Sequence, residues 1–178
     1  MTKAGRGLAA LANILAAAAL CACGLAAADT IEGKIVAIAD GDTLTLLTSD
    51  HRQVKIRVAG IDAPEKAQAF GQAAKKAMSD CAFGKQANVE WKKLDRFGRT
   101  IGKLTVDGAD CGLRQIELGL AWHYKAYERE QQQADRLAYA EAERDAQKAG
   151  RGLWAEAHPT PPWDFRHAAK NQHGATAD

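Results

Sequence analysis

Apolar and polar residues alternate along the chain between residues 30 and 58. The alternation falls into three sets, which the turn-forming pairs Asp40-Gly41 and Ser49-Asp50 separate. The members are Ile31, Gly33 and Ile35 in the first set, Leu44 and Leu46 in the second, and Val54, Ile56 and Val58 in the third. This pattern predicts three antiparallel strands. Because side chains alternate across a strand, Arg57 is expected to point away from the core face.

A helical period replaces the alternation from residue 70 onward. Apolar residues at i, i+3, i+4, i+7, i+8 and i+11 predict an amphipathic helix over 70–81 that stops at Gly84. The later patterns predict a hairpin with strands over 86–94 and 99–106, a short helix over 111–118 capped by Asp110, and a long helix over 128–148. After that helix, three prolines are expected to hold the tail extended, with the last dozen residues disordered.

Five strands with one inserted helix and further helices behind them predict the α+β class, built on a small antiparallel barrel. The expected organisation is a leader over residues 1–28, one folded domain over 29–157 and a proline-containing tail over 158–178. About 150 residues remain without the leader, which is enough for one domain with a substantial core.

The first 28 residues predict export. Lys3 and Arg6 precede an apolar run over residues 8–20, and small residues follow up to Ala28. The run is too short to span a membrane, which takes about 20 apolar residues. Cleavage after Ala28 would release a periplasmic or secreted domain. Cys23 supports a second interpretation, a bacterial lipoprotein signal that leaves the protein anchored through an acylated Cys23. The sequence leaves both open.

The net charge of the exported chain gives no argument for nucleic-acid binding. The whole chain has 24 Lys and Arg against 22 Asp and Glu, and loss of Lys3 and Arg6 with the leader makes the counts 22 against 22. A basic stripe over residues 85–103 holds six cations against two acidic residues. It is either a surface that attracts phosphate or the solvated outer face of a strand pair.

Two cysteines, Cys81 and Cys111, remain after the leader. In an oxidising compartment such a pair predicts one disulfide, which would stabilise the fold by about 3–4 kcal/mol. The alternative is two buried thiols. Neither the cysteines nor the five histidines have the spacing of a zinc site.

Four acidic residues lie near two predicted strand ends. Asp40 and Asp42 belong to "ADGDT", and Asp62 and Glu65 belong to "GIDAPE". Crowded carboxylates are unfavourable unless a cation neutralises them, and Ca²⁺ accepts oxygen ligands from carboxylates, carbonyls and water. Each stretch taken alone is also a common turn. Turn and metal site therefore remain alternatives at this point.

Two arginines favour the metal site over a simple turn. Arg57 lies on the strand that leads into "GIDAPE", and Arg99 follows the turn Phe97-Gly98. Guanidinium groups stay charged and bind phosphate oxygens through paired hydrogen bonds. Two of them facing a carboxylate-bound metal are typical of a phosphoryl-transfer site. No Ser-His-Asp or Cys-His spacing in the sequence offers a rival nucleophile.

Four segments, in order, resemble the staphylococcal-nuclease-like (thermonuclease) family. They are "ADGDTLTLL", "KIRVAGIDAPE", "DRFGRTIGKL" and "GLAWHYKAY", and the resemblance covers roughly residues 31–154. It implies a five-stranded OB-fold Greek-key barrel with about three helices. It also implies hydrolysis of phosphodiester bonds in DNA and RNA that depends on one Ca²⁺ ion and leaves 3′-phosphates.

The resemblance also implies a set of metal ligands. Asp42 and Asp62 match the carboxylate ligands of calcium, and the backbone carbonyl of Ala63 matches a further ligand. Asp40 matches a nearby acidic position that acts on the metal without binding it directly.

The remaining matches concern catalysis and the substrate. Glu65 matches the proposed general base, and Arg57 and Arg99 match the arginines that hold the phosphate. Tyr127 matches an aromatic residue of the nucleotide pocket, whereas Lys125 stands where the family has a second tyrosine.

A preference for single strands is expected, because a shallow barrel face with Tyr127 at its rim suits splayed nucleotides. A monomer without an obligate protein partner is the default expectation. The competing function is a non-catalytic OB-fold module that binds nucleic acid. Such a module has no need to keep the acidic residues and arginines together, so the complete set favours the nuclease.

Overall fold

The computed structural model of the chain describes residues 29–174. The predicted leader, its cleavage site and the alternative anchor at Cys23 lie outside these described residues, as do residues 175–178.

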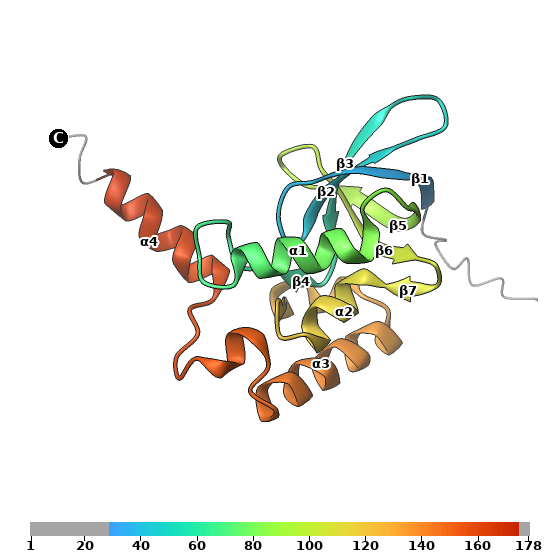
Figure 1. Cartoon of the computed structure of the whole chain (residues 1–178). Coiled ribbons are helices and arrows are strands. Elements are labelled where there is room, and N and C mark those ends of the chain that lie inside the picture. Colours follow the sequence, from blue (N-terminus) through green and yellow to red (C-terminus); the bar gives the residue numbers. More distant parts are fainter. Residues whose placement is uncertain (1–28, 175–178) are drawn as a thin grey trace, which may run out of the picture.

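Five strands form a closed barrel (Figure 1). They are β1 (Asp29–Ile38), β2 (Thr43–Leu47), β3 (Gln53–Val58), β5 (Gln86–Leu94) and β6 (Thr100–Val106). The pairs β1–β2, β1–β5, β2–β3 and β5–β6 are antiparallel, and the pair β3–β6, which closes the barrel, is parallel. The predicted α+β class and five-stranded barrel are confirmed, but the barrel is mixed and not wholly antiparallel. A closed ring with an odd number of strands cannot alternate direction all the way round, so one pair must be parallel.

The barrel interior follows the predicted alternation. In β3, Ile56 and Val58 are buried, and Arg57 between them faces outward. Burial of one such aliphatic side chain contributes roughly 1.5–3 kcal/mol, so the packing fixes which face Arg57 occupies. Three short strands lie outside the barrel ring, β4 (Ile61–Asp62), β7 (Ala109–Asp110) and β8 (Trp122–His123). The pairing of β4 with β8 positions Asp62 opposite Trp122.

Four α-helices lie within the described residues, one more than the sequence predicted. They are α1 (Gly71–Ala82), α2 (Cys111–Glu117), α3 (Gln133–Lys148) and α4 (Pro162–Gly174), accompanied by the 3₁₀ helices η1 (Lys125–Glu130) and η2 (Gly152–Ala155). The long helix expected over 128–148 is divided into η1 and α3, because Gln131 and Gln132 have extended backbone angles between them. Asp110 caps α2 as predicted, accepting hydrogen bonds from two backbone amides.

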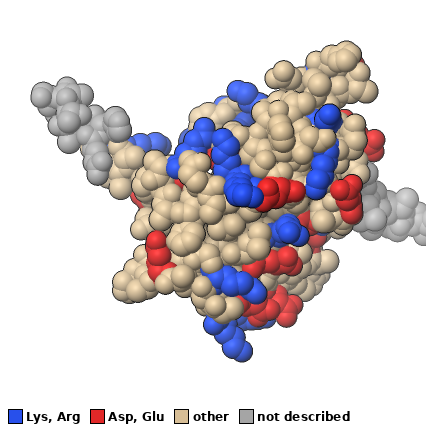
Figure 2. Space-filling view, in the orientation of Figure 1, with Lys and Arg blue, Asp and Glu red and all other residues tan. Residues whose placement is uncertain are grey.

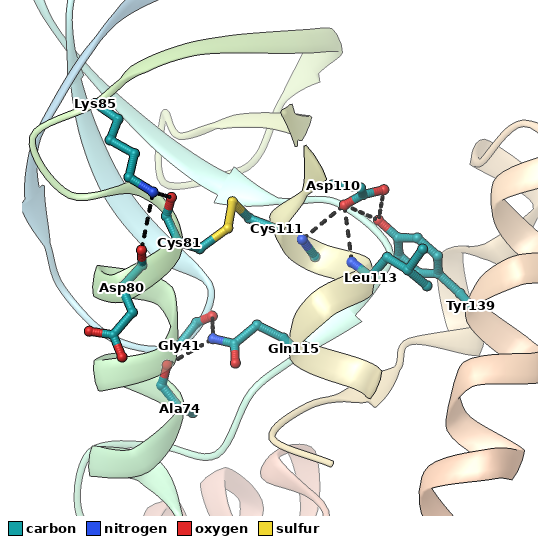
Figure 3. Close-up of a disulfide and its surroundings, with 11 residues drawn as sticks. Gly41, Ala74, Asp80, Cys81, Lys85, Asp110, Cys111, Leu113, Gln115 and Tyr139 are labelled. Carbon is teal, nitrogen blue, oxygen red and sulfur yellow. Dashed lines mark hydrogen bonds between the residues drawn. A yellow bond between two sulfur atoms is a disulfide. The ribbon is translucent and has the colours of Figure 1, made fainter. Parts of the chain in front are cut away.

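The predicted disulfide between Cys81 and Cys111 is present and joins α1 to the start of α2, with 6.0 Å between the Cα atoms (Figure 3). Gln115 of α2 also contacts α1. Its buried Nε2 donates to the carbonyl oxygens of Gly41 and Ala74, both at 2.8 Å. The turn that carries the first acidic pair is therefore tied to both helices.

The C-terminal segment is not extended as predicted from its prolines. In place of an extended tail, residues 162–174 form α4, which projects from the body of the molecule (Figure 1). Pro162 is the first helical residue, a position where a missing amide hydrogen costs no helical hydrogen bond. The Trp163 ring stacks on Tyr124 at 5.7 Å between centroids and meets the edge of Trp122 at 6.2 Å. Packing on the domain therefore outweighs the tendency of a proline-rich segment to stay extended.

The surface seen in Figure 2 carries cations and anions interspersed, without a field of one sign, in keeping with the balanced charge of the sequence. No helix among residues 29–174 is both long and apolar enough to cross a membrane.

Candidate active site

The acidic turn between β1 and β2 forms one edge of the site. Asp40 shapes the turn, because its Oδ1 accepts hydrogen bonds from the amides of Asp42 at 3.1 Å and Thr43 at 2.8 Å. Gly41 is needed for packing, since a Cβ there would lie 2.7 Å from the Cβ of Ala74. The Asp40 carboxylate thus accepts hydrogen bonds from the backbone of the turn, whereas Asp42 lies directly before β2.

Arg57 joins the two halves of the predicted acidic set. Its Nη2 lies 2.8 Å from Asp62 Oδ1 and 3.2 Å from Asp42 Oδ2. Its Nη1 donates to the carbonyl oxygens of Val58 at 2.9 Å and Ile61 at 2.8 Å. Two carboxylates and two carbonyls therefore hold this guanidinium, and the Arg57 side chain is 14% exposed.

Burial and like charges act on the carboxylates. Burial and, secondly, the charge of Asp42 raise the pKa of Asp40 to about 6. Burial also raises the pKa of Asp62, and this outweighs the opposing effects of the Arg166 hydrogen bond and the Arg57 charge. Asp42 additionally accepts a hydrogen bond from the Ala63 amide at 2.8 Å. Carboxylates so crowded gain from any further cation placed among them.

A third arginine, which is not among the predicted site residues, also reaches this cluster. Arg166 of α4 donates from Nη1 to Glu65 Oε1 at 2.8 Å and to Asp62 Oδ1 at 3.2 Å, and from Nη2 to Asp62 Oδ2 at 2.8 Å. The available signal was Pro162, a residue favoured at the first helical position. A helix starting there would have directed attention to Arg166 one turn later.

Arg99 approaches from the β5–β6 turn. Its Nε donates to Asp95 Oδ2 at 2.7 Å and its Nη1 lies 3.3 Å from Thr43 Oγ1, next to Asp42. Asp95 in turn accepts from the amides of Phe97 and Arg99. The turn and the guanidinium are therefore fixed by the same carboxylate.

These residues line one cleft of about 1000 Å³. The predicted residues along it are Asp40, Asp42, Arg57, Asp62, Ala63, Glu65, Arg99 and Tyr127. Tyr127 is 51% exposed, and the centroid of its ring lies 5.3 Å from that of the Tyr124 ring. Lys125 is the exception: it does not line the cleft, and its Nζ pairs instead with Glu143 of α3.

The donor set fits a calcium ion that takes part of its coordination from water. Asp42 and Asp62 contact the same Arg57 nitrogen, so both carboxylates are within reach of one cation. Among residues 29–174, no group of three or more His, Cys, Asp or Glu side chains is arranged to hold a metal by itself. Two carboxylates and the Ala63 carbonyl would leave positions for water, which suits the six to eight oxygen ligands of calcium.

The arrangement combines hard oxygen donors, a carboxylate that can accept a proton and guanidinium groups on the walls of one open cleft. Such a site can bind a phosphodiester, neutralise charge on its oxygens and activate water.

Comparisons with known proteins also indicate a nuclease. A family model described as "Staphylococcal nuclease homologue" matches residues 55–156. A protein of Haemophilus influenzae named "Uncharacterized endonuclease" is 39% identical over 137 residues, covering 77% of this chain and 74% of that protein. A "Micrococcal nuclease" of Shigella flexneri is 36% identical over 173 residues, covering 92% of this chain and 96% of that protein. "Protein ParB" of Escherichia coli is 33% identical over 151 residues, covering 80% and 82%.

Proposed function

The chain belongs to the staphylococcal nuclease family, and from that premise we propose that it is an exported, calcium-dependent nuclease acting on DNA and RNA. The family and the names of the relatives support hydrolytic nuclease activity. The observation that carries the finer proposal is the Arg57 guanidinium, which bridges Asp42 and Asp62 in a cleft that Glu65 and Arg99 also line.

Each residue has a role in the proposed mechanism. Calcium, when held by Asp42, Asp62 and the Ala63 carbonyl, would supply positive charge to a phosphate oxygen and orient a water molecule. Glu65 accepts a proton from the water as its oxygen attacks phosphorus.

The two arginines act on the phosphate in this mechanism. Arg57 and Arg99 donate hydrogen bonds to the phosphate oxygens as their negative charge grows in the transition state. The bond from phosphorus to the 5′ oxygen breaks, the leaving 5′ oxygen takes a proton from solvent, and Glu65 returns its own proton to solvent. The products are a 3′-phosphate and a 5′-hydroxyl.

The cleft supports a preference for single strands. The half-exposed ring of Tyr127 can stack on a base that is free to leave its neighbours, and stacking of this kind tolerates any base. Activity on both DNA and RNA follows, because none of these contacts depends on the 2′ position. A monomer without an obligate protein partner completes the proposal.

Export is supported by the disulfide, since such bonds persist in oxidising compartments. We propose a periplasmic or secreted enzyme, with attachment through an acylated Cys23 as the alternative.

The decisive experiment uses the exported mature protein on denatured DNA and on RNA, with Ca²⁺ and then with excess chelator. Hydrolysis is expected with Ca²⁺ alone, and a polymerase should extend the DNA fragments only after a phosphatase removes their 3′-phosphates. Hydrolysis that persists under chelation would remove the metal mechanism. Binding without any cleavage would favour the OB-fold binding module instead.

A further inference from the structure

Helix α4 brings the guanidinium of Arg166 into the cleft. The proposed mechanism does not use this cation. Building on the proposed function, we propose that Arg166 is a substrate-binding residue that changes partner. Its guanidinium neutralises Asp62 and Glu65 until a divalent cation takes its place there. It then binds a backbone phosphate of the nucleic-acid strand, next to the phosphate held by Arg57 and Arg99.

The contacts of Arg166 and of the cation overlap. Nη1 of Arg166 is shared between Asp62 and Glu65, and Nη2 contacts the other oxygen of Asp62. A calcium ion bound to Asp62 needs the same oxygens, so the guanidinium and the dication compete for them. Because binding free energies are reciprocal, the guanidinium weakens calcium binding by the same factor by which bound calcium weakens the guanidinium contact.

Arg166, and not Arg57, is the arginine able to leave. Arg57 donates to two backbone carbonyls as well as to carboxylates, and it is 14% exposed. The hydrogen bonds of Arg166 end on carboxylate oxygens, and its side chain is 40% exposed. Loss of these carboxylates would leave Arg57 anchored by the two carbonyls and Arg166 without a hydrogen-bond acceptor among residues 29–174.

The helix keeps the displaced guanidinium in the cleft. Trp163 packs on Tyr124 and Trp122, so α4 is anchored by contacts that do not involve the acidic cluster. Trp163, Arg166 and Lys170 lie at i, i+3 and i+7, and all three line the cleft. A guanidinium held there binds a phosphate through paired hydrogen bonds, which makes a strand phosphate its natural second partner.

The test is Arg166→Ala in the mature protein, examined in two binding measurements. Calorimetric titration with Ca²⁺ alone should show tighter binding by the variant, by several-fold, because the competing cation is gone. In saturating Ca²⁺, a fluorescent phosphorothioate oligothymidylate should bind the variant about tenfold more weakly, the effect of one charged hydrogen-bonding group. The dependence of log K on log salt concentration should fall by about 0.7 for one lost single-strand phosphate contact.

Arg144→Ala is the matched control. It also removes one positive charge, but Arg144 lies on α3, is 69% exposed and does not line the cleft. Both of its affinities should equal those of the wild type. Arg166→Lys keeps the positive charge but cannot donate the paired hydrogen bonds of a guanidinium, so it should retain part of the oligonucleotide affinity. It replaces the alanine variant if that variant fails to fold.

Opposite shifts in the two affinities support the proposal. Tighter calcium binding with unchanged or tighter oligonucleotide binding would make Arg166 only a block on the carboxylates and overturn it. Unchanged or weaker calcium binding by the variant, or a wild type that binds no calcium, would overturn it too. A wild type that shows the opposite shifts but cleaves neither DNA nor RNA would refute the proposed function alone.

Discussion

At the scale of single residues, Arg57 and Glu65 show two ways in which a side chain can be held at a site. Arg57 is enclosed by four acceptors and compensates two buried carboxylates. Glu65 is 37% exposed and receives its hydrogen bond from a residue of another element, Arg166. Their replacement should therefore affect the protein differently, although both are expected to be essential for turnover.

Arg57→Ala and Glu65→Gln should each lower kcat by several orders of magnitude. Arg57→Ala should also lower the free energy of unfolding by about 3 kcal/mol, because it removes the guanidinium that pairs with the buried Asp42 carboxylate and leaves the buried Asp62 carboxylate paired with Arg166. Glu65→Gln should leave the free energy of unfolding within about 0.5 kcal/mol of the wild type, as is usual for exposed positions. Steady-state kinetics and urea denaturation measure the two effects separately. A Glu65→Gln enzyme with near wild-type kcat would show that another group accepts the proton.

Asp95 offers a pH-dependent test of the turn that carries Arg99. Burial alone would raise the pKa of Asp95, but hydrogen bonds from the Arg99 and Phe97 amides and from the Arg99 guanidinium outweigh it and hold the pKa below its ordinary value. Because the folded-state pKa is lowered, the stabilisation is complete above the unfolded-state pKa. It is lost as the pH falls through the folded-state value.

Asp95→Asn should therefore lower the free energy of unfolding by about 1 kcal/mol at pH 7, and this difference should shrink as the pH falls below about 3.8. Denaturation of both proteins at a series of pH values measures it. Asp107→Asn, in the connection between β6 and β7 and away from the cleft, is the control. A difference that stays constant down to the lowest pH would show that the Asp95 charge is not responsible.

At the scale of elements, the contact between α1 and α2 supports the acidic turn from behind. The disulfide joins the two helices, and Gln115 extends the contact to Gly41, which lies between Asp40 and Asp42 (Figure 3). The two parts have different physical roles. The disulfide restricts the unfolded chain, whereas Gln115 satisfies two buried carbonyl groups in the folded one.

Replacing both cysteines by alanine should lower the free energy of unfolding by about 3–4 kcal/mol, for a loop whose ends are 30 residues apart. Chemical denaturation of the double variant and of the wild type under non-reducing conditions gives the difference. Thiol titration of the unfolded, unreduced mature protein should detect no free thiol, and two titratable thiols would contradict the disulfide.

At the scale of the whole molecule, the sequence predicts most where a local pattern decides the structure. Strand alternation predicted β1 to β3 and the outward direction of Arg57, and residue spacing predicted the helix that became α1. The same patterns, with the family resemblance, identified Asp42, Asp62, Glu65 and Arg99, which one cleft brings together. In each case the information lies within a few residues.

The parts that the sequence did not predict depend on contacts between distant segments. The tail became α4 because Trp163 meets Tyr124 and Trp122, and no pattern within the tail contains that contact. Lys125 pairs with Glu143 because α3 passes beside it, so its place two residues before Tyr127 in the sequence did not predict where its side chain lies. The parallel pair β3–β6 likewise follows from closing the ring and not from either strand alone.

That parallel pair also links correct folding to catalytic competence. Arg57 pairs with Ile101 across it, and Arg99 stands just before β6, so the alignment of these two strands sets the spacing between the two guanidinium groups. A slip of β3 by one residue would turn Arg57 into the core and Ile56 out to water, because side chains alternate with a period of two. A misregistered barrel would thus lose its phosphate-binding pair at the same moment as its packing. Recovery of nuclease activity after refolding should consequently report strand register, a property that far-ultraviolet circular dichroism does not distinguish.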